Sequence, residues 1–329
     1  MALNIHAMEL EVALDAVRHA AQFSERVSAA MRGADAAIKA DCSPVTVADY
    51  GVQAIIQKKL NHAFPGDLIV AEEEAGHLEH EDNRALMNQL LDLLQYEDPH
   101  WTKEQIISQI GRGGYNGGEH GRFWALDPID GTKGFIRGDQ YAIALALIEN
   151  GKPVLGVLGC PRLSLPGHDF PTPGTLCYSD GKSSYAESLA GSLPRELHVS
   201  NLREPRHARI SESLESGHSS HGTSAAIAGE LGIAAAPVRM DSQAKYAAVA
   251  SGMADLYLRL PTKADYREKI WDHAAGALLV ITAGGTVGDV SGVPLDFGKG
   301  KTLASNRGVI ASAPGIYDNV VEVVSRYFA

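Results

Sequence analysis

The chain has 329 residues, enough for one large α/β unit or two domains with a sizeable core. Hydrophobic residues make up 45 % and charged residues 21 % of the chain, which is ordinary globular usage and excludes an intrinsically disordered protein. There are 29 Lys and Arg against 40 Asp and Glu, for a net charge of −11. This balance argues against a broad surface for nucleic acid, so we expect any anionic ligand to be small and locally bound.

The number of cysteines and the acidic residues near the amino terminus are typical of a protein in a reducing compartment. Cys42, Cys160 and Cys177 form no CxxC pair, and an odd number cannot all pair within one chain, so we expect neither a disulfide framework nor a cysteine-based zinc site. Glu9 and Glu11 interrupt the segment where a signal peptide would be apolar, and no window resembles a membrane span. We therefore expect a cytoplasmic protein with no nucleic-acid or membrane partner.

The first part of the chain reads mainly as helices. Apolar residues at spacings of three and four predict amphipathic helices over residues 8–30 and 47–63. The apolar run LIVA predicts a short buried strand over residues 68–71, directly before three glutamates. Further helices are predicted over 83–96 and 103–110.

The middle of the chain predicts an antiparallel sheet. RFWALDPID, residues 122–130, reads as a strand that ends in a turn. The next two strands are joined at Asn150-Gly151, a strong hairpin signal, and Asp180-Gly181 offers another hairpin turn.

After Pro194 the pattern changes to alternating elements. We predict a strand at 238–240, a helix from Ser242, a strand in DLYLRL and a helix from Asp272. We therefore expect a domain over residues 1–195 and a second one over 196–329.

The segment WALDPIDGT carries the strongest chemical signal. Taken alone, DPIDG is an ordinary type I turn. Here, however, an apolar strand delivers Asp127 and Asp130, and Thr132 follows two residues later. Carboxylates gathered at the end of a buried strand must be paired, solvated or bound to metal, and hard cations such as Mg²⁺ use such oxygen ligands.

Three further acids have the same character, and each also has a simpler interpretation. Asp49 lies in SPVTVAD near the start of a helix, where an acid complements the helix dipole. Glu72 follows the strand LIVA and could be its exit to solvent. Asp272 opens an apolar helix, where capping alone would explain it.

The four motifs SPVTVAD, AEE, WALDPIDGT and WDHAAG occur in this order over most of the chain. Together they resemble the lithium-sensitive, Mg²⁺-dependent phosphatases related to inositol monophosphatase. This resemblance implies an α/β protein, a layered α+β sandwich, with a large antiparallel sheet in an N-terminal domain and a smaller C-terminal α/β domain. The metal ions, two or three per site, would lie between the domains.

The same resemblance assigns roles to these residues. It implies that Glu72, Asp127 and the Ile129 carbonyl hold one Mg²⁺ and that Asp127, Asp130 and Asp272 hold a second. It further implies that Thr132 and Asp49 position and deprotonate the attacking water. Independently, two bridged cations can activate water and stabilise the leaving oxygen of a phosphate monoester.

The second half narrows the family. DSQAKYAAVASGMADLYLRLP and REKIWDHAAG look more like the 3′(2′),5′-bisphosphate nucleotidases, which convert 3′-phosphoadenosine 5′-phosphate to AMP. This closer resemblance implies that Ser242, Lys245, Arg259 and His221 hold the nucleotide and its 5′-phosphate, with Asp272 also near the substrate. A second phosphate needs such donors, although a lone lysine is more often a solvated surface group.

Two other functions stay open. An inositol polyphosphate 1-phosphatase shares the metal motifs, and Lys245 and Arg259 could hold its second phosphate. A non-catalytic nucleotide sensor is the alternative of a different class. A sensor would be expected to have lost a residue of the metal and water set, and none is missing. Action on the sulfated precursor of the bisphosphate is a further expectation.

Overall fold

The computed structural model describes residues 6–33, 44–167, 174–214, 221–263 and 265–328, without the side chains of residues 31–33, 44–46 and 221. Cys42 and the side chain of His221 therefore lie outside the described residues, whereas Cys160 and Cys177 are buried free thiols. Among the described helices, none has an apolar stretch long enough to cross a bilayer.

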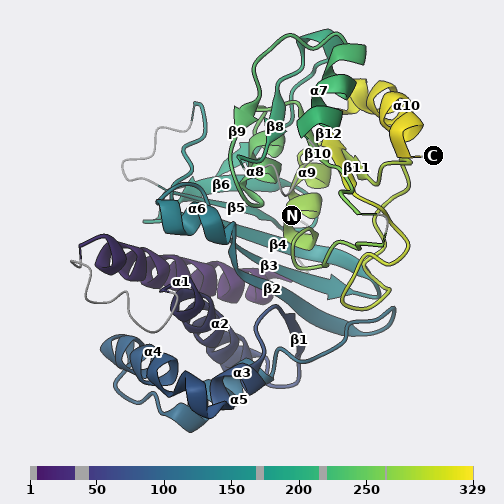
Figure 1. Ribbon diagram of the computed structural model, residues 1–329. Coiled ribbons are helices and arrows are strands. Elements are labelled where there is room, and N and C mark those ends of the chain that lie inside the picture. The colour runs from purple at the N-terminus through teal and green to yellow at the C-terminus, as the bar shows by residue number, and fades with distance from the viewer. Residues whose placement is uncertain (1–5, 34–43, 168–173, 215–220, 264, 329) are drawn as a thin grey trace.

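Helices and two sheets alternate in layers (Figure 1). The helices are α1 (Ala7–Gly33), α2 (Pro44–Ala63), α3 (Ala75–Glu79), α4 (Arg84–Glu97), α5 (Lys103–Gly111), α6 (Thr132–Arg137), α7 (His221–Glu230), α8 (Ala244–Ala250), α9 (Ala274–Thr282) and α10 (Tyr317–Phe328). The strands are β1 (Leu68–Ala71), β2 (Arg122–Asp130), β3 (Ala142–Glu149), β4 (Lys152–Cys160), β5 (Thr175–Ser179), β6 (Ser184–Ser188), β7 (Arg195–Leu197), β8 (Ile210–Glu212), β9 (Val238–Arg239), β10 (Leu256–Arg259), β11 (Thr286–Gly288) and β12 (Val309–Ser312).

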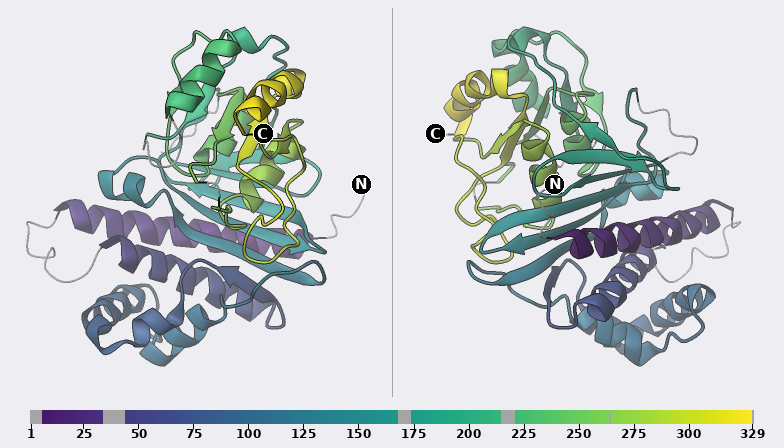
Figure 2. Two further views of the ribbon diagram at one scale, coloured as in Figure 1. Left: turned by 45° about the vertical axis from the view of Figure 1, so that its right-hand side comes forward. Right: turned by 180° about the vertical axis from the view of Figure 1, so that it is seen from behind.

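The larger sheet has the order β1-β2-β3-β4-β5-β6-β7, and the smaller one has the order β11-β12-β10-β8-β9. The larger sheet is antiparallel except that β1 runs parallel to β2. α1 and α2 cover one face of it, and α8 and α9 lie between its other face and the smaller sheet (Figure 2). α7 and α10 contact each other on the outer side of the smaller sheet.

Most predicted elements are confirmed within a few residues, and the differences have physical causes. α2 begins at Pro44, because proline is well accommodated in the first turn of a helix. α9 begins at Ala274, so the expected start at Asp272 is wrong, and likewise α8 begins at Ala244 rather than Ser242. α7 was not predicted because its sequence lacks an apolar stripe.

DPID is not a turn in the structure. β2 continues to Asp130, and its register against β3 shifts between Asp127 and Asp130. Such an irregularity re-aims side chains at the end of a strand. The chain turns only at Gly131, whose φ of +87° suits glycine.

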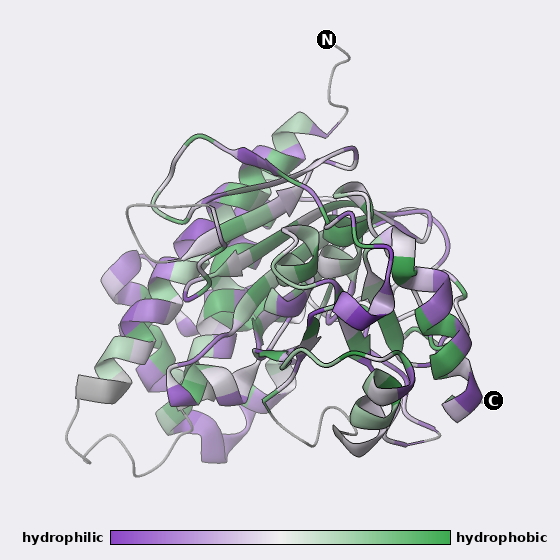
Figure 3. Ribbon diagram, turned by 90° about the horizontal axis from the view of Figure 1, so that it is seen from above, coloured by the Kyte–Doolittle hydropathy of each residue, from purple (hydrophilic) through white to green (hydrophobic). Residues whose placement is uncertain are grey.

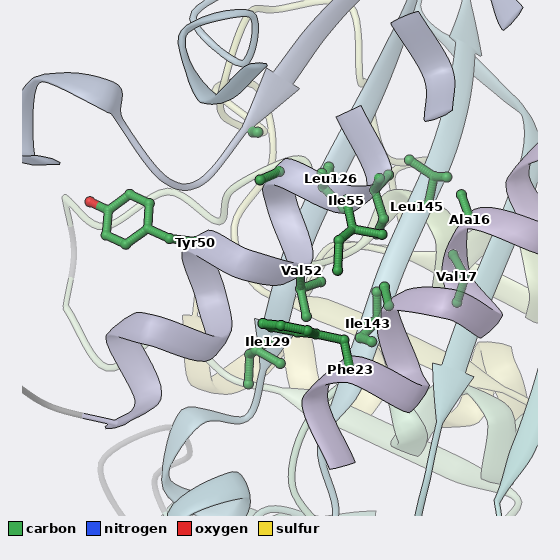
Figure 4. Packing of buried hydrophobic residues seen from close by; sticks show 14 of the residues in the cluster. Ala16, Val17, Phe23, Tyr50, Val52, Ile55, Leu126, Ile129, Ile143 and Leu145 are labelled. Carbon is green, nitrogen blue, oxygen red and sulfur yellow. The ribbon is translucent and has the colours of Figure 1, made fainter. Parts of the chain in front are cut away.

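Strands β2, β3 and β5 of the larger sheet are buried along nearly their whole length, so both faces of the sheet are covered there. Figure 3 shows the hydropathy of the residues along the ribbon. Leu126, Ile143 and Leu145 pack against α1 and α2, where Figure 4 shows them around Phe23 and Val52. On the opposite face, alternate residues of β2 and β3 are mainly alanines, and they pack against α8 and α9.

Small residues let α9 approach the sheet closely. α9 begins Ala-Ala-Gly-Ala, and Gly156 of β4 faces its backbone. A Cβ atom built on Gly156 would lie 2.9 Å from the Ala275 carbonyl oxygen. This close packing holds the start of α9 directly against the larger sheet.

We predict that Gly156→Ala lowers the free energy of unfolding by about 1–3 kcal/mol, the range for overpacking. The added methyl group would meet backbone atoms of α9, which cannot rotate away. Urea unfolding measures the loss. Gly66→Ala is the matched control, since a Cβ there meets nothing within 4 Å; equal losses in both variants would contradict this account of the α9 packing.

Candidate active site

A cavity of about 670 Å³ opens between the two sheets. Its walls are the end of β2 with the start of α6, the segment before α8, and the chain from β10 to α9. Residues that are far apart in the sequence therefore line the same cavity. Of the residues expected to act, the cavity is lined by Glu72, Asp127, Ile129, Asp130, Thr132, Ser242, Lys245, Arg259 and Asp272.

One side of the cavity is acidic. Asp127 and Asp130 come from the end of β2, Glu72 from the residue after β1, and Asp272 from the segment before α9. β1 and β2 are parallel neighbours, so their carboxyl ends meet at the same edge. The side chain of Ile129 is buried in the core against α1 and α2 (Figure 4), which anchors the backbone between the two aspartates.

The acidic groups raise one another's pKa values. Burial first, and then the charges of Glu72, Asp130 and Asp272, hold the pKa of Asp127 well above its usual range. The loss of solvent around Glu72, and then the charges of Glu73 and Asp130, raise its pKa to about 7. One part of its side chain stays exposed to the cavity. Burial and neighbouring carboxylates also raise the pKa of Asp272.

This donor set fits a hard divalent cation. Asp127 is only 2 % exposed, and its Oδ1 atom has no hydrogen-bond partner among the described residues. A buried, unpartnered carboxylate oxygen facing further carboxylates is unfavourable unless a cation neutralises it. Oxygen ligands of this kind suit Mg²⁺.

The two residues expected to act on water occupy different places. Thr132 begins α6 and lines the cavity, and its hydroxyl donates to the Ile129 carbonyl at 3.4 Å. Asp49 is buried on α2 behind the acidic side and does not line the cavity. Burial, and then the charges of Glu73 and Glu72, raise the pKa of Asp49 well above its usual value.

The other side of the cavity is cationic. Lys245 lies on α8 and is 4 % exposed, with its Nζ 5.3 Å from the centre of the Tyr257 ring. Burial lowers its pKa to about 8, although the charge of Asp130 acts in the opposite direction. Ser242 is buried beside it, with a φ of +69°.

Arg259 ends β10 and is fixed by a chain of buried hydrogen bonds. Its Nε lies 3.3 Å from Glu268 Oε1, and this carboxylate holds the pKa of Arg259 above its usual value against the effect of burial. His273 Nε2 lies 3.2 Å from Glu268 Oε2, and His273 Nδ1 lies 2.7 Å from the Tyr246 hydroxyl. Both ring nitrogens of His273 are therefore in use.

Glu268 and His273 were missed in the sequence, although they flank Asp272 in the motif EKIWDH. Glu268, Asp272 and His273 offer ligand atoms within 4.8 Å of one another. Because His273 has partners on both nitrogens, we assign Glu268 and His273 to holding Arg259 rather than to binding metal. The signal available in the sequence was the density of titratable residues around Asp272.

One interpretation of this site needs correction. Asp272 does not cap α9, because the N-cap position is His273 and α9 begins at Ala274. The backbone of His221 begins α7, and its side chain lies outside the described residues.

Comparisons with known proteins give matches over nearly the whole chain. The model of the inositol monophosphatase family matches residues 8–326. A protein of Schizosaccharomyces pombe named 3′(2′),5′-bisphosphate nucleotidase is 44 % identical, over 96 % of this chain and 95 % of its own length. A protein of Oryza sativa with the same name is 43 % identical, over 98 % and 94 %.

The solved structure of the Thermotoga maritima IMPase matches with a TM-score of 0.64 at 21 % identity, over 97 % of both chains. This likeness confirms the expected layered α/β fold. The family match spans nearly the whole chain, and the resemblance found in the motifs is confirmed. This chain belongs to the inositol monophosphatase family.

Proposed function

We propose that this chain is an Mg²⁺-dependent 3′(2′),5′-bisphosphate nucleotidase that hydrolyses 3′-phosphoadenosine 5′-phosphate to AMP and phosphate. The observation that carries the proposal is one cavity with carboxylates on one side and the buried Lys245 and half-buried Arg259 on the other. Such a cavity offers separate places for a reacting and a non-reacting phosphate. The names of the relatives at 43–44 % identity support this substrate.

Enzymes of this family depend on a divalent metal ion. We propose that Glu72, Asp127, the Ile129 carbonyl, Asp130 and Asp272 hold two or three Mg²⁺ ions here. Bound Mg²⁺ supplies Lewis-acid polarisation of the phosphoryl oxygens and a lowered pKa of bound water. The raised pKa values of the carboxylates fit residues that release protons when a cation binds.

In this proposal Thr132 orients the attacking water. The family resemblance assigns Asp49 to deprotonating it, although Asp49 is buried behind the acidic side and does not line the cavity. The Thr132 hydroxyl lines the cavity directly after the two β2 aspartates. The raised pKa of Asp49 makes its carboxylate a stronger base than an exposed aspartate. Water attacks phosphorus, the bond from phosphorus to the 3′ oxygen breaks, and that oxygen receives a proton.

The 5′-phosphate is held by Lys245, Arg259 and Ser242 in this proposal. Arg259 presents a planar set of donors suited to phosphate, and the contact with Glu268 fixes its orientation. The family resemblance adds His221 as a contact to the nucleotide. The proposed phosphate contacts leave the 3′-phosphate facing the acidic side.

Phosphate release on a small substrate panel tests the proposal. The panel holds the adenosine bisphosphate, its sulfated form, 3′-AMP, an inositol bisphosphate and an inositol monophosphate, each with and without Mg²⁺. We expect the highest kcat/KM on the adenosine bisphosphate and none without metal. Preference for the inositol bisphosphate would support an inositol polyphosphate 1-phosphatase instead, and binding without turnover of any substrate would indicate a sensor.

We predict that Lys245→Ala lowers kcat/KM on the adenosine bisphosphate by roughly tenfold to a hundredfold. The reason is the loss of a charge-assisted hydrogen bond, worth about 1–3 kcal/mol. 3′-AMP lacks the 5′-phosphate and serves as the control substrate, on which the loss should be much smaller. Equal losses on the two substrates would remove Lys245 from the 5′-phosphate site.

Asp49→Asn and Thr132→Ala should lower kcat by about 10²–10⁴-fold, the range for general-base assistance. Nucleotide affinity should stay within a few fold, because both residues act on water. Stopped assays give kcat, and calorimetry in Ca²⁺ gives affinity. A variant that no longer binds the nucleotide would show that the residue has a structural role.

Asp127→Asn should make the metal-free protein at least as stable as the wild type, since it removes one charge from a repelling group. It should also abolish stabilisation by Mg²⁺, which for the wild type amounts to about 2.7 kcal/mol at a hundred times Kd. Thermal unfolding with EDTA and with Mg²⁺ measures both effects. Equal Mg²⁺ stabilisation of the two proteins would argue against Asp127 as a ligand.

A further inference from the structure

Gln243 joins three segments at the centre of the site. Its backbone N–H donates to Asp130 Oδ2 at 2.5 Å. Its side-chain Nε2 donates to the Trp271 carbonyl at 2.8 Å, and its Oε1 accepts from the Gly276 N–H at 3.1 Å. The residue is 2 % exposed, so these bonds are shielded from water.

Each partner of Gln243 is directly tied to the acidic side. Asp130 ends β2, and Trp271 immediately precedes Asp272. Gln243 thus links Asp130 Oδ2 to the backbone that carries Asp272 through hydrogen bonds from one residue. Both ends of its amide are used on backbone groups, which assigns the amide to structure around the site rather than to ligand recognition.

The bond to Gly276 also completes the start of α9. The first N–H groups of a helix have no partner within it. His273 occupies the N-cap position, and its side chain makes no cap hydrogen bond. The Gln243 oxygen takes that place from a different segment, which fixes the end of α9 next to Asp272.

The segment that carries Gln243 is strained. Ser242 has a φ of +69°, a conformation that is unfavourable for a non-glycine residue and persists only where its surroundings hold it. A Cβ atom built on Gly131 would lie 3.0 Å from Ser242 Cβ, so the end of β2 presses closely on this turn. The bonds of Gln243 lie directly after the strained residue.

We propose that Gln243 is a positioning residue that sets the separation of the Asp130 and Asp272 carboxylates and thereby the affinity for Mg²⁺. This inference rests on the proposed metal-dependent function. Displacements of about 1 Å in such a site can cost about a hundredfold in rate. Removing the amide would free the Trp271 carbonyl and the Gly276 N–H, so the segment with Asp272 could shift away from β2.

The test compares Gln243→Met with Asn306→Leu. Methionine keeps the length of glutamine without its hydrogen bonds. Asn306 is a matched control because it is also 2 % exposed. Its amide likewise bonds on both sides, to Asp289 and the Pro294 carbonyl as donor and from the Asp296 N–H as acceptor, but it does not line the cavity.

Calorimetry with Mg²⁺ alone, without nucleotide, gives the decisive measurement. We expect Gln243→Met to bind Mg²⁺ at least tenfold more weakly than the wild type, and Asn306→Leu to bind it as the wild type does. Urea unfolding shows whether each variant is folded. Should Gln243→Met fail to fold, Gln243→Asn, whose side chain is too short for both bonds, is expected to give the same weakening.

Kinetics separate this role from substrate binding. Gln243→Met should lower kcat/KM by the same factor on the adenosine bisphosphate and on 3′-AMP, and higher Mg²⁺ should recover part of the loss. Unchanged Mg²⁺ affinity in a folded Gln243 variant, or equal weakening in Asn306→Leu, would overturn the inference. A wild type that binds no Mg²⁺ would overturn the proposed function and the inference together.

Discussion

The repulsion among the carboxylates at the end of β2 is the constraint on which the site depends. Burial raises the pKa values of Asp127, Asp130, Glu72 and Asp272. Neighbouring carboxylates raise those of Asp127, Glu72 and Asp272 further, whereas the charge of Lys245 acts against the effect of burial on Asp130. Without a cation, this group favours separation of the segments that carry it. The rest of the fold must therefore hold those segments together, and the stability for that comes from apolar packing elsewhere.

The packing that does this is unusually close on one side of the larger sheet. Alanines on β3 and Gly156 on β4 face the small residues that begin α9. Larger residues on this face would push α9 outward and carry Asp272 with it. On the opposite face, the sheet packs with leucines, isoleucines and aromatic rings.

The sequence predicts the site where each residue follows a recognisable element. Glu72, Asp127 and Asp130 stand at the ends of apolar strands, and Thr132 follows the glycine turn. Burial of Asp49 behind the cavity could not be predicted, because the predicted helix start at residue 47 placed Asp49 in the first turn, where an acid is usually exposed. α2 begins at Pro44, so Asp49 lies beyond its first turn. The hydrogen-bond partners of Gln243 and Arg259 could not be predicted either. Hydrogen bonds between distant segments produce no regular residue spacing that can be recognised in the sequence. The predicted start of helix α9 is two residues early, because aspartate is a residue type that commonly caps helices, whereas the N-cap position is His273.

The opposite charges of the two sides of the cavity determine which end of a substrate binds at which side. Asp130 faces both sides, since its carboxylate accepts from the Gln243 N–H and its charge favours the protonated form of Lys245. When cations neutralise the acidic side, this support for the Lys245 charge is weakened, and a phosphate placed beside Lys245 restores it. Binding of metal and binding of the second phosphate should therefore favour each other, because each neutralises the charge of its own side and leaves the opposite charge of the other side uncompensated. A substrate with one phosphate can neutralise only one side, so the proposed preference for a bisphosphate follows from the charge arrangement and not from the shape of the cavity alone.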